Sequence, residues 1–307
     1  MGIMLRFIGQ RAAFIILVCV AIIFFSHMGM RMIPNSDARN PNYDLVEHAL
    51  LAWQDTRTYL TNAIHNDLGN ARIDNRLVPA LAVLKESYVN SLGLLFVAMV
   101  SATTLGLLAG MTMALTNRKR LILILLAATI LGMSTPAFLG GLLLQRAEIF
   151  YVSRGGRQLV KLAGFGWDYQ HMLLPVIVLT ARPLAYLTRA SFLSLKRIME
   201  EDFIRTAYAK GLSTFRTVNF HALKNVAVPF LTAVGVSIRF SLGVLPIVEF
   251  FFVWPGIGLR LLQAINQRQT ILVVTLSLAL GLTFLIINLL LDIAYWIIDP
   301  RFREREA

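Results

Sequence analysis

The sequence predicts an all-α integral membrane protein with six transmembrane helices. Apolar residues make up 57% of the 307 residues, only 15% are charged, and the mean hydropathy is +0.66. A soluble domain has roughly 45–50% apolar and about 25% charged residues, so this composition argues against a soluble globule and excludes a disordered chain. The charged residues are also confined mainly to a few segments between long apolar runs.

Six apolar runs are long enough to cross a hydrocarbon core of about 30 Å, which takes roughly 20 residues. Four of them lack Lys, Arg, Asp and Glu: 12–30, 91–115, 121–144 and 271–291. The other two contain arginine: 173–195 has Arg182 in its middle and Arg189 near its inner end, and about 226–253 has Arg239. The first run could be a signal peptide, but its length and the lack of a clear cleavage site favour a retained helix.

The distribution of charge predicts both termini on the cytoplasmic side. Lys and Arg number 29 against 17 Asp and Glu, a net charge of +12. A basic excess of this size can indicate a protein that binds nucleic acid. Here the excess is explained by membrane topology, because basic residues concentrate in the cytoplasmic loops of membrane proteins. With the N-terminus inside, the inner segments hold 15 basic and six acidic residues, and the outer ones 12 and nine. The short basic loop 116–120 is the strongest indicator, whereas the bases in 145–172 point the other way.

We therefore expect four parts in the chain. Residues 1–30 form the cytoplasmic N-terminal end and the first span, and 31–88 form an extracytoplasmic segment with a helix over 45–64. Residues 89–300 form a core of five spans, and 301–307 are a cytoplasmic tail.

The cytoplasmic segment 199–228, between spans four and five, is too long for a simple turn. Acidic residues at 200–202 favour a helix start there, and Gly211 suits the left-handed position that ends a helix. Ser213 can cap a second helix that runs to about Val226 and into the fifth span. Physical reasoning leaves two interpretations open: a solvated connector, or a docking helix for a cytoplasmic partner.

The residue pattern here is more specific. Residues 202–213 (DFIRTAYAKGLS), followed by His221-Ala222-Leu223-Lys224-Asn225 and Pro229, closely resemble the coupling motif of ABC-importer permeases of the peptide branch. The resemblance continues at Glu249, Trp254-Pro255-Gly256-Ile257-Gly258 and Asp299-Pro300-Arg301. The basic N-terminus followed at once by a span is similar to the first, B-type permease of dipeptide and oligopeptide importers. The glutamate of the general family motif falls on Arg205, as is common in the peptide branch.

This resemblance implies a type I ABC importer permease (MetI-like) bundle with a cytoplasmic coupling helix, in a prokaryotic inner membrane. It implies as partners a second, distinct permease chain, two ABC ATPase subunits and an extracytoplasmic solute-binding protein, which residues 31–66 are expected to touch. ATP and Mg would bind to those ATPase subunits. This chain is expected to bind neither a cofactor nor nucleic acid. The coupling role falls on Asp202, Arg205, Ala207, Lys210, Gly211 and Leu212.

The resemblance leaves the solute open among dipeptides, oligopeptides, glutathione, nickel chelates and sugars. The sequence contains no phosphate-binding loop, no zinc-protease motif and no nucleophile elbow, so we expect no catalytic or metal site.

Charged residues within the spans are costly and tend to face the interior or a cavity. Arg239 and Glu249 are candidates for a pore lining or gate, with a structural role as the equal alternative: pairing between spans, or extension of the side chain toward the membrane interface. For Asp292 we expect the structural role, in either of these two forms. The competing hypotheses are a secondary transporter driven by an ion gradient and a membrane enzyme. The first predicts inverted repeats and midplane acids, and the sequence shows neither.

Overall fold

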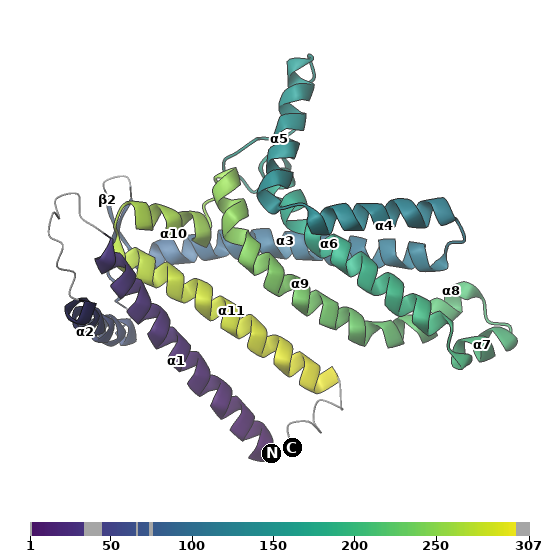
Figure 1. Ribbon diagram of the computed structural model, residues 1–307, viewed down its shortest axis with the longest axis horizontal. Coiled ribbons are helices and arrows are strands. Elements are labelled where there is room, and N and C mark those ends of the chain that lie inside the picture. The colour runs from purple at the N-terminus through teal and green to yellow at the C-terminus, as the bar shows by residue number, and fades with distance from the viewer. Residues whose placement is uncertain (1, 34–44, 66, 74–75, 299–307) are drawn as a thin grey trace. The chain divides into compact units, whose positions relative to one another are not determined.

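The computed structural model describes residues 2–33, 45–65, 67–73 and 76–298 (Figure 1). Nearly all of this chain is helical. The elements before the centre of the chain are α1 (Gly2–Met32), α2 (Leu45–Ile64), β1 (Asn70–Ile73), β2 (Arg76–Pro79), α3 (Ala80–Leu115), α4 (Lys119–Ser134) and α5 (Ala137–Ser153). They are followed by α6 (Tyr169–Met199), α7 (Asp202–Ala209), α8 (Thr214–Arg216), the π-helical turn η1 (Thr217–Ala222), α9 (Leu223–Phe252), α10 (Ile257–Asn266) and α11 (Thr270–Ile298).

The membrane architecture expected from the sequence is confirmed. In the described ranges, five helical stretches are long and apolar enough to span a membrane: Gly9–Met32, Ala80–Leu115, Tyr169–Met199, Thr214–Phe252 and Thr270–Ala294. The bent pair of α4 and α5 makes a sixth if it counts as one span. The helix expected over residues 45–64 is also present, as α2.

The span expected over 121–144 is broken into two helices. α4 ends at Ser134, α5 begins at Ala137, and their axes differ by 112°. Thr135 is extended, with φ −79° and ψ 119°, because the ring of Pro136 disfavours the helical conformation of the preceding residue. Proline also lacks the N–H that would continue the helix. α5 then continues to Ser153, well into the segment that the sequence assigned to an outer loop.

A small antiparallel hairpin, which the sequence did not predict, follows α2. Strands β1 and β2 pair with Asn70 opposite Pro79 and Ile73 opposite Arg76. Gln269 holds the hairpin: its amide oxygen accepts the N–H of Arg72 at 2.8 Å, and its amide nitrogen donates to the Arg72 carbonyl at 2.6 Å.

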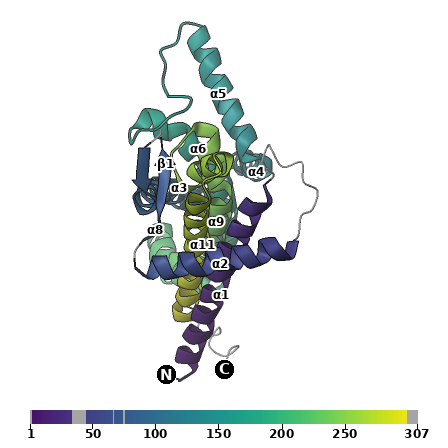
Figure 2. The ribbon, with the colours of Figure 1, turned by 90° about the vertical axis from the view of Figure 1, so that its left-hand side faces the viewer.

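The chain forms two compact units. Residues 2–91 and 255–292 belong to the first, and residues 92–254 belong to the second. In the first unit, α2 crosses α1 (Figure 2), and the Tyr59 hydroxyl forms a hydrogen bond of 3.0 Å with Thr275 on α11. The buried cluster of this unit draws Val83, Ile257, Leu272 and Leu276 from α3, α10 and α11.

The structural role expected for Asp292 is confirmed, in the form of pairing between spans. Its carboxylate lies 2.9 Å from the guanidinium of Arg11, so the pair joins α11 to α1. Pairing lowers the cost of placing either charge near the membrane.

The second unit is built on the packing of α6 against α9 and of α3 against α6. Gly106 and Gly110 lie on the face of α3 that approaches α6. The Ser191 hydroxyl on α6 donates to the Gly106 carbonyl at 3.0 Å. Gly106 and Gly110 thus form a small-xxx-small pair that allows close packing of two helices.

The segment 154–168, between α5 and α6, is tied down by hydrogen bonds. Glu148 accepts the N–H groups of Leu159 and Val160, and Gly164 donates to the carbonyl of Phe252 at 2.8 Å. Asp168 caps α6, and the hydrogen bond from the His171 ring lowers the pKa of its carboxyl group. An ordered connection thus replaces the plain loop expected there.

Trp167 and Trp254 lie near the ends of predicted spans, where tryptophan often anchors a helix at the membrane interface. Trp254 is instead completely buried, with the Trp167 ring packed edge-to-face on it at 5.4 Å between centroids. Phe165 packs on the same ring at 4.9 Å, so this aromatic cluster closes one end of α9.

The contact between α3 and α6 gives a stability prediction. In the Gly110→Ala variant the new Cβ would overlap the Ser191 hydroxyl and lie 2.6 Å from the Thr188 carbonyl oxygen. Overpacking of this kind typically costs about 1–3 kcal/mol. We expect a lower midpoint of thermal unfolding for this variant purified in detergent.

Gly243→Ala on α9 is the matched control, because no atom lies within 4 Å of the position that its Cβ would take. Alanine is favoured over glycine in a helix by about 1 kcal/mol, so the control should be as stable as the parent or more so. Equal unfolding midpoints for the two variants would contradict the proposed packing.

Candidate functional site

The segment between α6 and α9 folds as the sequence predicts. α7 begins at Asp202, Gly211 adopts φ +78° after the end of α7, and the Ser213 hydroxyl accepts the N–H of Arg216 at the start of α8. The Leu212 N–H returns to the Ala207 carbonyl at 3.2 Å, which closes the turn. The result is a short helix, a tight glycine turn and a second helix.

α7 is anchored by two apolar side chains. Ile204 is completely buried and Ala207 is 6% exposed. Ile204 belongs to a buried cluster with Leu195 on α6 and Val226 on α9. This anchoring fixes which face of α7 points outward.

The predicted coupling residues divide between the two faces. Asp202, Arg205, Lys210 and Gly211 are exposed, and Leu212 is half-buried. Arg205 and Asp202 lie 3.4 Å apart across one turn, with 75% and 95% of their side-chain surfaces exposed. Pairs as exposed as this one contribute little stability, so both charges are available to a partner.

Ala207 is the exception. The resemblance assigns it to coupling, but the structure packs it against the chain's own core. The reason is that Ile204 and Ala207, three residues apart, form the apolar stripe of this short helix. Any role of Ala207 in coupling therefore concerns the position of α7.

Four exposed aromatic side chains in this segment were missed by the sequence reasoning. Phe215 and Phe220 are 75% and 72% exposed, and Phe203 and Tyr208 are exposed as well. Aromatic residues are enriched where proteins bind one another. The sequence did contain a sign of this, because four aromatic residues occur within one short polar segment.

A π-helical turn lies in the same segment. η1 (Thr217–Ala222) joins α8 to α9 without a break, and the Thr217 hydroxyl is buried with no hydrogen-bond partner among the described residues. Such turns occur frequently at functional sites.

The two candidate gate residues differ in burial. Glu249 is completely buried in the last turn of α9, where its main-chain carbonyl accepts the N–H of Trp254 at 2.8 Å. Its burial favours a structural role. Arg239, near the middle of the same helix, is half-buried, and its Nε is enclosed without a hydrogen bond to any described residue. The structure does not bring the two together.

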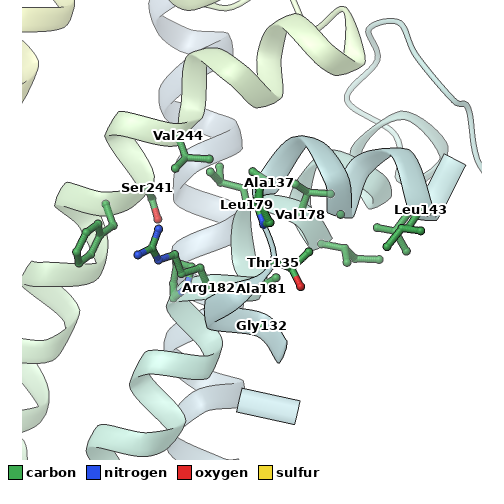
Figure 3. A pocket seen from close by; sticks show the side chains of 16 residues that line it. Gly132, Thr135, Ala137, Leu143, Val178, Leu179, Ala181, Arg182, Ser241 and Val244 are labelled. Atoms are coloured by element: carbon green, nitrogen blue, oxygen red, sulfur yellow. The ribbon is translucent and has the colours of Figure 1, made fainter. Parts of the chain in front are cut away.

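A third charged residue, Arg182, is exposed in this single chain and borders a pocket. Arg182 on α6 lines a pocket of about 270 Å³ at the break between α4 and α5 (Figure 3). Its guanidinium lies 4.8 Å from the ring centroid of Phe240 on α9, a cation–π contact. A charge at the centre of a membrane helix costs about 2.5–3.5 kcal/mol on insertion scales, so such residues usually serve a function.

No cluster of three or more His, Cys, Asp or Glu that could hold a metal ion occurs in the part of the chain that the structure describes. The lone thiol, Cys19, lies in α1.

Comparison with known proteins agrees with this arrangement. Residues 103–304 match the family model described as binding-protein-dependent transport system inner membrane component. The chain is 32% identical over 248 residues to the glutathione transport system permease protein GsiC of Escherichia coli (strain K12), covering 80% of this chain and 78% of that protein. The proteins of the same name from Shigella dysenteriae serotype 1 (strain Sd197) and Shigella flexneri serotype 5b (strain 8401) are 32% and 31% identical over the same shares of each chain.

The chain therefore belongs to the family of binding-protein-dependent transport system inner membrane components, as a non-catalytic, multi-pass permease subunit of an ABC importer whose ATP is hydrolysed by partner ATPase subunits.

Proposed function

We propose that this chain forms half of a translocation path for peptides or small peptide-like solutes, and that segment 199–228 receives the motion of an ATPase subunit. The observation that carries the proposal is the helix–glycine turn–helix that exposes Asp202, Arg205 and Lys210 while Ile204 is anchored in the core. Because Ile204 holds α7 to the core, a partner can displace the exposed face of α7 without unfolding the helix.

The anchoring supplies a route for force. Ile204 packs in one cluster with Leu195 of α6 and Val226 of α9, and α8 and η1 continue directly into α9. A displacement of α7 would therefore move α6 and α9 together, as rigid-body switching requires. Rotation of these helices would expose the path to one side of the membrane and then to the other.

The finer assignments of partners and topology follow from the same proposal. Both termini lie in the cytoplasm, two ATPase subunits bind on that side, and a second, distinct permease completes the path. A binding protein delivers solute on the outer side, where α2 and the β1–β2 hairpin would form its contact surface. The basic loop 116–120 supports this orientation.

Glutathione is a candidate solute because the named relatives are glutathione permeases. Dipeptides and oligopeptides remain within the proposal, because the binding protein selects the solute in a system of this kind.

The function can be tested with the complete importer in proteoliposomes. With ATP inside and binding protein outside, we expect uptake of glutathione or of short peptides, and none without ATP. Uptake that needs an ion gradient but no ATP would overturn the proposal and favour a secondary transporter. Co-purification of the permease with an ATPase subunit gives a second readout.

Gly211 gives a sharper test of coupling. A β-branched residue is strained at φ +78°, so Gly211→Val should distort the turn that positions α7. We expect ATP hydrolysis to continue while solute uptake falls at least about tenfold. Measuring both rates on one preparation checks this.

Two variants control for strain. Gly211→Asn should retain transport, because asparagine tolerates the left-handed conformation. Gly155→Val introduces the same substitution at φ +89° in the connection after α5, where no atom lies within 4 Å of the added Cβ. Full transport by Gly211→Val would refute the coupling role.

A further inference from the structure

The cavity at Arg182 has an unusual composition. Its walls come from four helices, α4, α5, α6 and α9, and are mostly aliphatic. Among the described residues that line it, Arg182 is the one with an ionisable side chain, and Thr135 and Ser241 supply hydroxyl groups. Figure 3 shows Arg182 reaching from α6 toward Ser241 of α9.

The charge of Arg182 is not neutralised within the described chain. No carboxylate lies within ion-pair distance of it there, and its described partner is the face of the Phe240 ring. This differs from Arg11, whose charge is paired with Asp292. An arginine at mid-span with no counter-charge among the described residues has hydrogen-bond donors available for another group.

The surroundings decide which group fits. A fixed cation attracts an anion and repels a second cation, and both effects grow as the dielectric constant around the cation falls. The planar guanidinium suits a carboxylate, with which it can form two parallel hydrogen bonds. The aliphatic walls favour an apolar portion attached to that carboxylate.

We propose that this cavity is a binding site for the carboxylate end of an anionic solute on its way through the permease. The inference rests on the proposed function and deepens it by naming the chemistry that the path recognises. At about 270 Å³ the cavity is smaller than the roughly 300–1,000 Å³ of pockets that enclose a drug-sized ligand. It would therefore take one end of a peptide, with the free carboxylate against Arg182.

The site can be tested with a cysteine placed in the pocket, by comparing how fast its thiol reacts with an anionic and with a cationic reagent. Thr135→Cys, made in a Cys19→Ser background, puts the one thiol of the chain on the cavity wall. In the assembled importer we would compare its reaction rates with a negatively charged sulfonate and a positively charged trimethylammonium methanethiosulfonate. We expect the anionic reagent to be favoured.

Removing the charge should remove that preference. In Arg182→Gln the ratio of the two rates should fall at least about tenfold, because the fixed cation attracts one reagent and repels the other. Arg182→Lys should keep most of the ratio. Arg189→Gln, an exposed arginine two turns further along α6, is the matched control and should leave the ratio unchanged.

Transport supplies the second readout. With the same binding protein throughout, uptake of a tripeptide and of its C-terminal amide is compared between the parent and Arg182→Gln. We expect the ratio of tripeptide uptake to amide uptake to be at least about tenfold lower in the variant than in the parent, with the rate of ATP hydrolysis unchanged.

The inference is overturned if Arg182→Gln leaves both ratios unchanged. It is also overturned if the parent shows no preference for the anionic reagent, as it would if a carboxylate of the second permease neutralised Arg182. In either case ATP-dependent uptake by the parent would leave the proposed function intact. Absence of uptake by the parent would count against that function instead.

Discussion

The structure depends first on a constraint of the bilayer: within hydrocarbon every backbone N–H and C=O must find a partner inside the protein. Helices meet this requirement within a single segment, which explains why the long apolar runs of this chain are helical. The informative places are those where the helical pattern is interrupted. The extended residue Thr135 before Pro136 and the π-helical turn 217–222 are two such places.

The interruption at Pro136 shows that a proline alone does not decide the outcome. Pro175, Pro183, Pro229 and Pro246 lie inside α6 and α9, which continue through them. At Pro136 the chain turns by 112°, and the turn creates the cavity wall that faces Arg182. A helix break at membrane depth is tolerated where it is buried in protein or lines a cavity, and the position of Pro136 satisfies the second condition.

Much of the fold follows from sequence patterns, because length and hydropathy determine which segments can span a membrane. The turn at Gly211 was also predictable, since few residues other than glycine adopt positive φ. Two features were not. The burial of Ala207 depends on Ile204 meeting Leu195 and Val226, contacts between residues distant in sequence. The burial of Trp254 under Trp167 likewise depends on how the connection 154–168 folds back. The six residues assigned to coupling were identified by a resemblance, and the exposed phenylalanines beside them only by the structure.

One feature of the second unit has a mechanical consequence. From Thr214 to Phe252 the chain remains helical through the π turn, 39 residues that make a rod about 58 Å long. A rod of this kind transmits torque as well as displacement, so a twist applied at the end near α7 reaches the aromatic cluster at the far end. The helix resists twisting least at the π turn and at Pro229 and Pro246, because each of these places lacks part of the regular hydrogen-bond pattern of an α-helix. The stiffness of these joints sets how much of an ATP-driven twist arrives at the end of the path rather than being absorbed along the way.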